Sequence, residues 1–508
     1  MANILYDALF APLAARENTL ITTADGGTIS GAAFLALVHR QANALRALGL
    51  RPGDRLALQV AKSPEALALY GAALAAGVVV LPLNTAYTPA EVAYFLGDCG
   101  AAVLVGDAAA AEGLAAVAAD HGARFVTLNG DGSGSFSDLV ASQSAAFSVV
   151  SRGGTDLAAL LYTSGTTGRS KGAMLSHDNL LSNAEVLREH WRFTSGDVLL
   201  HALPIFHTHG LFVASNVVLS AGASMIFLPG FSLPQVLRFL PQASVMMGVP
   251  TFYTRLLDAP EFTRDLVAHM RLFVSGSAPL LAETHIAFEE RTGHRILERY
   301  GMTETNMNTS NPYEGARRAG TVGPALPGVE LRITDPASGE QLPDGTPGMI
   351  EVRGPNVFKG YWNMPEKTRE ELRENGFFIT GDIGVIDDQG YVSIVGRAKD
   401  LIISGGYNIY PKEIELLLDE APEVLETAVI GVPHPDFGEA VVAVIVPKPG
   451  QSPTESALLA GLQSQLARFK QPKAIILRDE LPRNTMGKVQ KNLLRAEYAE
   501  LFRPVAQS

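Results

Sequence analysis

Short apolar runs alternate with longer segments of helical periodicity over the first 300 residues of the chain. Alternation at a spacing that leaves room for crossover helices indicates an α/β architecture with largely parallel sheets. The predicted strands are residues 55–60, 78–81, 102–106, 124–128, 159–162, 225–228 and 272–275.

The pattern changes between about residues 321 and 395, where short apolar runs are separated by frequent Gly and Pro. This part is predicted to be a small β-rich subdomain, with strands at 329–333, 349–353 and 391–395. Another α/β unit follows residue 399. Its predicted helices lie near 411–419 and 454–467, and its predicted strands at 427–432, 440–446 and 474–477.

Length and composition restrict the class of protein. At 508 residues the chain is too long for one core, and with 47% apolar and 18% charged residues it can bury a large interior. Its single cysteine, Cys99, excludes a disulfide framework and a Cys-rich metal site, which fits a reducing compartment. A formal net charge of −12 argues against nucleic-acid binding, so local positive groups must meet any polyanionic substrate.

No signal peptide is expected in residues 1–17, because charged side chains interrupt the candidate apolar region. Residues 66–83 carry no charge and are nearly long enough to cross a bilayer, but two glycines and Pro82 interrupt them. We interpret this run as an Ala-rich helix followed by the strand at 78–81. A cytoplasmic protein without membrane contact is expected.

The segment 162–172 concentrates residue types that bind phosphate. Its sequence is Tyr-Thr-Ser-Gly-Thr-Thr-Gly-Arg-Ser-Lys-Gly. Glycine lets backbone N–H groups approach an anion, hydroxyls donate hydrogen bonds, and lysine neutralises charge. Gly165, Gly168 and Lys171 are three residues apart, which is not the spacing of a Walker A loop. Taken alone, the segment is equally typical of a flexible connection.

Six motifs, in a fixed order from residue 162 to residue 488, resemble those of the adenylate-forming acyl-CoA synthetases. The first is the segment just described. The others are 300–304 (Tyr-Gly-Met-Thr-Glu), 354–362 (Gly-Pro through Gly-Tyr-Trp), 380–382 (Thr-Gly-Asp), 396–409 (Gly-Arg-Ala-Lys-Asp continuing into Ser-Gly-Gly-Tyr-Asn-Ile) and 482–488 (Pro-Arg-Asn-Thr-Met-Gly-Lys). Each motif alone is weak, but their common order argues against an accidental match.

The resemblance implies a large N-terminal AMP-binding domain, residues 1–398, which includes the β-rich subdomain at about 321–398. It also implies a mobile α+β C-terminal domain, residues 399–508, that rotates about Lys399. The implied reaction has two steps: a carboxylate attacks the α-phosphate of ATP to give an acyl adenylate and pyrophosphate, and the thiol of coenzyme A then displaces AMP. Such a site must hold two anions in line and stabilise charge at phosphorus.

The same resemblance implies a phosphate and magnesium site. The residues expected around the β- and γ-phosphates are Thr163, Ser164, Gly165, Thr166, Thr167, Gly168 and Lys171. Glu304 is the expected Mg²⁺ ligand, with the Thr163 hydroxyl beside it, and Thr303 belongs to the same nucleotide site. Most lone glutamates are solvated surface groups, so this role of Glu304 depends on the motif that contains it.

Further residues are expected, by resemblance, to bind the nucleoside. Asp382 would accept hydrogen bonds from both ribose hydroxyls, and Arg397 would join that contact. Tyr300 should stack on adenine, and the turn 275–279, which includes Ser277, would form the opposite wall. Without its motif, Tyr300 would be interpreted as a core aromatic residue.

Lys488 is the lysine that the resemblance places between the substrate carboxylate and the α-phosphate. A compact, mobile ammonium suits two anions that meet transiently. In the second step the C-terminal domain is expected to withdraw Lys488 and to bring Gly405 and Gly406 against the pantetheine arm of coenzyme A, where glycine leaves room. Acetylation would remove the charge of Lys488, so a lysine acetyltransferase is a candidate partner.

Two histidines, His207 and His209, lie in the segment Phe-His-Thr-His-Gly. Their i, i+2 spacing, with no Cys or acidic ligand nearby in the sequence, argues against a zinc site. The resemblance implies instead that His207 lies at the carboxylate end of the acyl pocket.

Arg299 restricts the substrate. Most members of the family have glycine directly before Tyr-Gly-x-Thr-Glu, where it lines the acyl pocket. A guanidinium there is a poor neighbour for a fatty tail and a good bidentate partner for a second carboxylate. Residues 298–305 closely resemble the malonyl-CoA synthetases, which implies malonate, and methylmalonate as a further substrate. In the alternative, Arg299 turns away and pairs with Glu298 or another acid.

Three rival functions stay open. With a structural Arg299, the chain would be a short-chain monocarboxylate–CoA ligase. An adenylation enzyme that loads a carrier protein is disfavoured, since no appended segment with a phosphopantetheine serine is visible. A non-catalytic nucleotide sensor would need few of the charged residues that are present, namely Lys171, Glu304, Asp382, Arg397 and Lys488.

Overall fold

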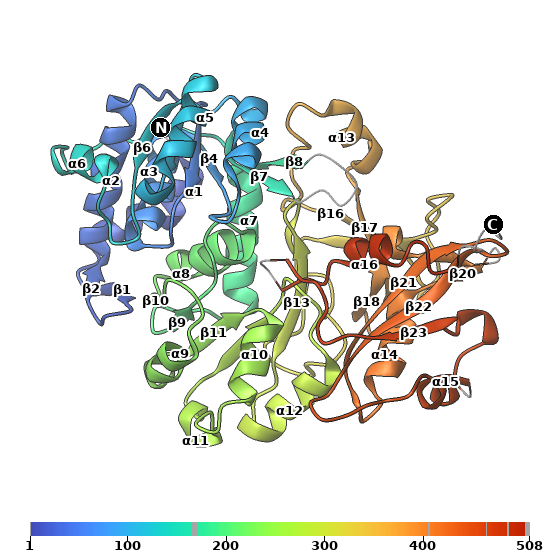
Figure 1. The fold of residues 1–508 in the computed structure, drawn as a ribbon. Helices are drawn as coiled ribbons and strands as arrows, with labels where there is room; N and C mark the ends of the chain where they lie inside the picture. Colours follow the sequence, from blue (N-terminus) through green and yellow to red (C-terminus); the bar gives the residue numbers. More distant parts are fainter. Residues whose placement is uncertain (1, 164–169, 405–406, 464, 485–486, 503–508) are drawn as a thin grey trace. The chain divides into compact units, whose positions relative to one another are not determined.

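The computed structural model describes residues 2–163, 170–404, 407–463, 465–484 and 487–502 (Figure 1). The chain forms two compact units. Unit 1 comprises Met1–Glu330 and Val352–Phe378, and unit 2 comprises Leu331–Glu351 and Ile379–Ser508. About half of the predicted β-rich subdomain thus shares a unit with the C-terminal residues. The predicted domain boundary between residues 398 and 399 concerns which part of the chain rotates during the reaction. The division into two units does not test it, so it stays a prediction.

One sheet of unit 1 has the strand order β6-β5-β3-β4-β7-β8. Its strands are β3 (Arg55–Gln59), β4 (Val79–Pro82), β5 (Val103–Gly106), β6 (Arg124–Thr127), β7 (Leu157–Thr163) and β8 (Lys171–Ser176). Neighbouring strands are parallel, except that β8 returns antiparallel to β7. The central strands are apolar on both faces, as expected for a parallel sheet that is covered on both sides.

The other sheet of unit 1 has the order β14-β13-β12-β11-β9-β10-β1-β2. Its strands are β1 (Thr19–Thr23), β2 (Thr28–Ser30), β9 (Val198–His201), β10 (Ser224–Phe227), β11 (Val245–Gly248), β12 (Leu272–Ser275), β13 (Leu297–Met302) and β14 (Asn306–Ser310). The strands from β1 to β13 along this order run parallel, while β2 and β14 close the two edges antiparallel. The predicted α/β class with largely parallel sheets is confirmed.

Helices connect these strands. In unit 1 they are α1 (Ile4–Leu9), α2 (Gly31–Ala47), α3 (Pro64–Ala76), α4 (Pro89–Cys99), α5 (Ala111–Asp120), α6 (Ser135–Ala141), α7 (His177–His190), α8 (Asn216–Ala221), α9 (Leu233–Phe239), α10 (Pro250–Leu257), α11 (Arg264–Val267), α12 (Ala282–Thr292) and α13 (Pro365–Glu371).

The uncharged run at 66–83 forms helix α3 followed by strand β4, as predicted. Ser63 caps the helix by accepting a hydrogen bond from the Ala66 N–H, and Gly77 ends it with a left-handed φ of 67°. All α3 side chains from residue 66 onward are buried, which explains why the run is apolar on every side. Among the described residues, no helix is both long and apolar enough to cross a membrane.

Unit 2 contains most of the sheet β15-β16-β17-β18 and a second sheet, in which β20, β19, β22 and β21 are neighbours and β23 pairs with β22. The strands are β15 (Glu330–Thr334), β16 (Gly348–Arg353), β17 (Phe378–Ile386), β18 (Val392–Arg397), β19 (Ile402–Ser404), β20 (Tyr407–Ile409), β21 (Val424–His434), β22 (Gly438–Pro447) and β23 (Ala474–Leu477). The helices are α14 (Pro411–Asp419), α15 (Glu455–Gln463) and α16 (Lys491–Glu497).

Strands β21 and β22 form the centre of unit 2. Alternate residues of the pair face two cores, one that includes Ile414 of α14 and Leu458 of α15, and one that includes Leu494 of α16. Because both faces are covered, both strands are apolar almost throughout. The pair is therefore a rigid base for side chains that project from its ends.

Candidate active site

The hairpin of β7 and β8 carries the predicted phosphate-binding segment. Its register places Thr163 opposite Lys171. The Tyr162 hydroxyl donates to the Asp98 carboxylate, and the Tyr94 hydroxyl donates to the Ser170 carbonyl at 2.6 Å. Both ends of the segment are thereby tied to α4.

Part of that prediction lies outside the described residues. The residues concerned are Ser164, Gly165, Thr166, Thr167 and Gly168 of the phosphate segment, together with Gly405 and Gly406, which are expected near the pantetheine arm. Their roles stay predictions.

Lys171 belongs to a hydrogen-bonded network that also contains Glu304. The Lys171 ammonium lies 3.1 Å from each carboxylate oxygen of Glu371 and 3.1 Å from the Tyr361 hydroxyl. That hydroxyl is 2.6 Å from Glu371 and 3.0 Å from Glu304. Since a hydroxyl has one proton, Tyr361 donates to one carboxylate at a time. The network connects the phosphate hairpin to the predicted magnesium ligand.

Glu304 is nearly inaccessible to solvent, with 5% of its surface exposed. Burial raises the pKa of this carboxyl group, while the hydrogen bond from Tyr361 and the charge of Lys171 oppose that rise. A carboxylate that is expensive to desolvate and only partly compensated is suited to bind a cation. Glu304 is therefore not the solvated surface group that a lone glutamate usually is.

Arg299 lies on β13 with 4% of its surface exposed. Its guanidinium rests on the backbone of Gly276, where a Cβ atom would come within 2.3 Å of the Arg299 Cζ and Nη1 atoms. The Nε and Nη2 atoms of Arg299 have no hydrogen-bond partner among the described residues. Burial lowers the pKa of Arg299 to about 9, and the neighbouring Tyr253 offsets part of that effect.

Glu298 does not pair with Arg299. Its Oε1 atom lies 3.6 Å from the His285 Nδ1 atom, and its carboxyl pKa is raised because the group is buried. Successive side chains of a strand point to opposite faces, so Glu298 and Arg299 project in opposite directions. The described residues therefore contain no ion pair between Glu298 and Arg299, which was the alternative left open by the sequence.

His209 lies near both Arg299 and His207. His209 Nδ1 is 3.1 Å from the Ser277 hydroxyl. Burial, followed by the charges of Arg299 and His207, holds the pKa of His209 well below its usual range. This histidine is therefore neutral at physiological pH. Across the described ranges no group of three His, Cys, Asp or Glu side chains is arranged to hold a metal ion.

Tyr300 and Thr303 extend the site along β13. Tyr300 is half-buried, pairs with Thr309 of β14, and has its hydroxyl 4.0 Å from the Met302 sulfur. Because it follows Arg299 directly on a strand, its ring points to the opposite face. That geometry is compatible with the two separate predictions, Arg299 in the acyl pocket and Tyr300 against adenine. Thr303 follows the end of the strand and is partly buried.

In unit 2, strands β17 and β18 place Asp382 directly opposite Arg397. The Arg397 Nε atom lies 3.1 Å from the Asp382 Oδ1 atom. Asp382 is buried, and its backbone N–H donates to the Thr380 hydroxyl at 3.1 Å. The two residues predicted to bind the ribose are therefore held together by the strand pair itself.

Lys488 and Lys399 lie in the same region of unit 2. Burial and the charge of Arg397 lower the pKa of Lys488 to about 8, although Asp382 and Asp400 act in the opposite direction. The pKa of Lys399 is lowered to about 8 by burial and by Arg397. The structure thus brings the predicted hinge, the predicted catalytic lysine and the predicted ribose pair together.

Several residues of these networks were not predicted. Glu371 is an ordinary charged residue of α13 in the sequence, and Tyr361 belongs to a quoted motif without an assigned role. Lys62, outside these networks, was not predicted either. Its ammonium lies 2.9 Å from His201 Nδ1 and 2.8 Å from the His201 carbonyl oxygen. Burial lowers the pKa of Lys62 well below the usual range. No local pattern connects the groups that matter here, because Lys171 is 200 positions from Glu371, Glu304 is 57 from Tyr361 and Lys62 is 139 from His201.

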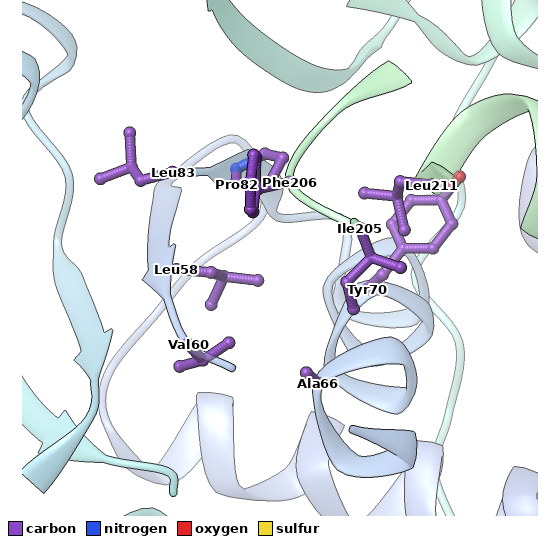
Figure 2. A pocket seen from close by; sticks show the side chains of 9 residues that line it. All are labelled: Leu58, Val60, Ala66, Tyr70, Pro82, Leu83, Ile205, Phe206 and Leu211. Atoms are coloured by element: carbon purple, nitrogen blue, oxygen red, sulfur yellow. The ribbon is translucent and has the colours of Figure 1, made fainter. Parts of the chain in front are cut away.

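Figure 2 shows a small apolar pocket in unit 1, with a volume of about 20 Å³. It is lined by Leu58, Val60, Ala66, Tyr70, Pro82, Leu83, Ile205, Phe206 and Leu211. The volume is about that of one water molecule, and the lining offers few polar groups to hold a carboxylate. We therefore do not assign it to the substrate, although Phe206 directly precedes His207.

Comparison with known protein families identifies the family to which this chain belongs. The family model described as AMP-binding enzyme matches residues 12–362, and the model described as AMP-binding enzyme C-terminal domain matches residues 413–488. The chain belongs to the AMP-binding enzyme family. The resemblance inferred from the motifs is confirmed at the level of the family.

Relatives of this AMP-binding enzyme act on different acids. It is 37% identical over 481 residues to a malonate–CoA ligase of Arabidopsis thaliana, with 88% of this chain and 78% of that protein covered. It is also 37% identical over 479 residues to a feruloyl-CoA synthase of an Amycolatopsis species, with 93% and 95% covered. The crystal structure of ATP-bound MatB from Rhodopseudomonas palustris is 59% identical, with a TM-score of 0.97 and coverage of 99% and 100%.

Proposed function

We propose that this AMP-binding enzyme ligates malonate to coenzyme A in an ATP-dependent reaction through malonyl-AMP, with release of AMP and pyrophosphate. Similarity to malonate–CoA ligases over most of the chain supports the proposal. The observation that carries it is Arg299, a buried guanidinium with two nitrogens that lack a hydrogen-bond partner among the described residues. A substrate with a second carboxylate would supply the missing acceptor.

The physical argument concerns the cost of burying a charge. A buried cation without a partner is destabilising, and a fatty tail beside it would leave that cost uncompensated. The distal carboxylate of malonate can accept two parallel hydrogen bonds from one guanidinium. Gly276 leaves room for this guanidinium, because a side chain at position 276 would displace it. Neutral His209 beside Arg299 adds no second positive charge that would repel the guanidinium.

ATP would bind with its phosphates at the β7–β8 hairpin, where Lys171 offers a cation, and with its ribose at Asp382 and Arg397. Glu304 and the Thr163 hydroxyl fit Mg²⁺, because this ion prefers oxygen ligands and is held in nucleotide sites by one or two protein groups plus phosphate and water. When bound, Mg²⁺ would neutralise part of the phosphate charge. Lys488 would approach the α-phosphate and the attacking carboxylate and lower their mutual repulsion.

In the second half-reaction the thiol of coenzyme A attacks the acyl carbon of malonyl-AMP, the acyl–phosphate bond breaks, and AMP leaves. We assign Lys399 as the hinge of the rotation between the two steps, and Gly405 and Gly406 to the pantetheine channel. Acetylation of Lys488 by a lysine acetyltransferase would block the first step by removing the ammonium. Use of methylmalonate and cytoplasmic localisation also stay predictions.

A substrate panel tests the proposal. Pyrophosphate release is measured with malonate, methylmalonate, acetate and propionate, with and without coenzyme A. Malonate should give the highest kcat/KM, and malonyl-CoA should form when coenzyme A is present. Preference for acetate or propionate would support the monocarboxylate ligase instead. Pyrophosphate release without any thioester to coenzyme A would favour an enzyme that loads a carrier protein.

A further inference from the structure

Backbone hydrogen bonds hold Lys488 against Asn484 in unit 2. The Asn484 N–H donates to the Lys488 carbonyl and the Gly487 N–H to the Asn484 carbonyl, both at 2.9 Å, and the Lys488 N–H donates to the Asn484 side-chain oxygen at 2.9 Å. Gly487 has a left-handed φ of 74°, which glycine adopts without strain. Arg483 and Val489, the neighbours of Asn484 and Lys488, form a β-bridge. The direction of Lys488 is thus set by the backbone that precedes it.

A guanidinium holds that backbone. The Nη1 atom of Arg483 donates to the Gly487 carbonyl at 2.5 Å, while its Nη2 atom donates to the Glu426 carboxylate. One planar side chain therefore connects the peptide group directly before Lys488 to a residue of β21. Both side chains are partly exposed, at 35% for Arg483 and 22% for Glu426.

Glu426 provides a fixed end for this connection. It lies near the start of β21, opposite Val446 of β22, in the strand pair that forms the centre of unit 2. Burial raises the pKa of Glu426, and the adjacent Arg483 lowers it. Asp419 of α14 is the neighbouring acid, and burial raises its pKa to about 6.

We infer that Glu426 and Arg483 are positioning residues for Lys488: they hold the Gly487 carbonyl and so direct the ammonium toward the group of Asp382 and Arg397. The inference rests on the proposed role of Lys488 in adenylation. A partly exposed ion pair contributes little to the stability of a fold, so its main effect should be on geometry. Misplacement of a catalytic group by about 1 Å can cost on the order of a hundredfold in rate.

The test compares Glu426→Gln and Arg483→Lys with Lys488→Ala and the wild type. Adenylation is measured as pyrophosphate release from malonate and ATP, and thioester formation is measured separately from supplied malonyl-AMP and coenzyme A. Both positioning variants should lose roughly tenfold in kcat of adenylation, with KM for ATP and thioester formation within about twofold of wild type. The double variant should be no slower than the slower single variant, because the two residues act as one unit.

Glu413→Gln is the matched control. It breaks the ion pair in which Lys470 Nζ lies 2.7 Å and 2.8 Å from the Glu413 carboxylate oxygens, also in unit 2 and also partly exposed. This control should leave both half-reactions unchanged.

Three outcomes would overturn the inference. Equal losses in both half-reactions would indicate that Glu426 and Arg483 only stabilise the fold. If Lys488→Ala lost adenylation selectively while both positioning variants kept wild-type rates, the inference alone would fail. If Lys488→Ala itself kept adenylation, the proposed role of Lys488 would fail first, and the positioning role with it.

Discussion

Arg299 in unit 1 and Lys488 in unit 2 are two cations withdrawn from water in different ways. Arg299 forms no ion pair with a described carboxylate, and two of its nitrogens lack hydrogen-bond partners among the described residues. Lys488 lies near the carboxylates of Asp382 and Asp400 as well as the cations of Arg397 and Lys399, and its pKa is lowered by burial and by Arg397. The first cation therefore has no carboxylate beside it among the described residues, whereas the second has two. An uncompensated buried charge is the stronger indication of a ligand.

The largest expected effect concerns Arg299. Arg299→Ala should lower kcat/KM for malonate by roughly 30- to several thousand-fold, equivalent to about 2 to 5 kcal/mol, because the distal carboxylate would be left without a partner. Acetate and propionate should lose far less. The measurement is kcat/KM for malonate, methylmalonate, acetate and propionate in both proteins. A uniform fall across all four acids would mean that Arg299 only supports the fold.

Two further variants sharpen this result. Arg299→Lys should recover malonate activity only in part, because an ammonium cannot form the two parallel hydrogen bonds of a guanidinium. Gly276→Ala should reduce malonate selectivity although Arg299 is retained, because the new Cβ would collide with the guanidinium. KM for ATP should be nearly unchanged in both variants.

The next effect concerns Lys488. Lys488→Ala should lower adenylation on the order of 10²- to 10³-fold, because a preorganised charge at the α-phosphate is removed. Thioester formation from supplied malonyl-AMP should be largely retained. Rapid-quench measurements of each half-reaction separate the two. Equal losses in both half-reactions would contradict the role assigned to Lys488. The two cations would then differ only in how they are packed.

A pH profile tests the environment of Lys488 without substitution. Because its pKa is about 8, the Lys488 side chain is mostly protonated below pH 8 and loses its positive charge as the pH rises through that value. The kcat/KM for adenylation should therefore fall roughly tenfold between pH 7 and pH 9, whereas thioester formation should lack this alkaline limb. Lys488→Arg should remove the limb, because a guanidinium stays charged. The same limb in both half-reactions would assign it to another group.

The smallest expected effect concerns the hinge. Lys399→Pro fixes φ at this residue and should slow thioester formation severalfold more than adenylation, if the protein rests in the adenylating state. Lys399→Ala removes the charge without fixing the backbone and should affect both steps little. Separate assays of the two half-reactions provide the measurement. Wild-type rates for Lys399→Pro in both would place the hinge elsewhere.

The sequence determined the fold class and the family. Apolar runs such as those of β3, β4 and β12 are local signals, because a buried parallel strand needs only a few consecutive apolar residues. The motifs are equally local, so the segments with Glu304, Asp382 and Lys488 can be named from a few consecutive residues each. Strands β9 and β11 were missed although they have the same length as β4 and β12, and the longer β13 and β17 were missed as well, so length does not separate the predicted strands from the others.

Only the tertiary structure decided how the charged residues are partnered. Lys171 and Glu371 are 200 positions apart, and Glu426 and Arg483 are 57 apart, so no periodicity connects them. The sequence left open whether Glu298 neutralises Arg299; the strand directs Glu298 to His285 and brings Arg299 onto the Gly276 backbone. Local patterns follow from backbone geometry over a few residues, whereas the compensation of a buried charge depends on every group that the fold brings near it.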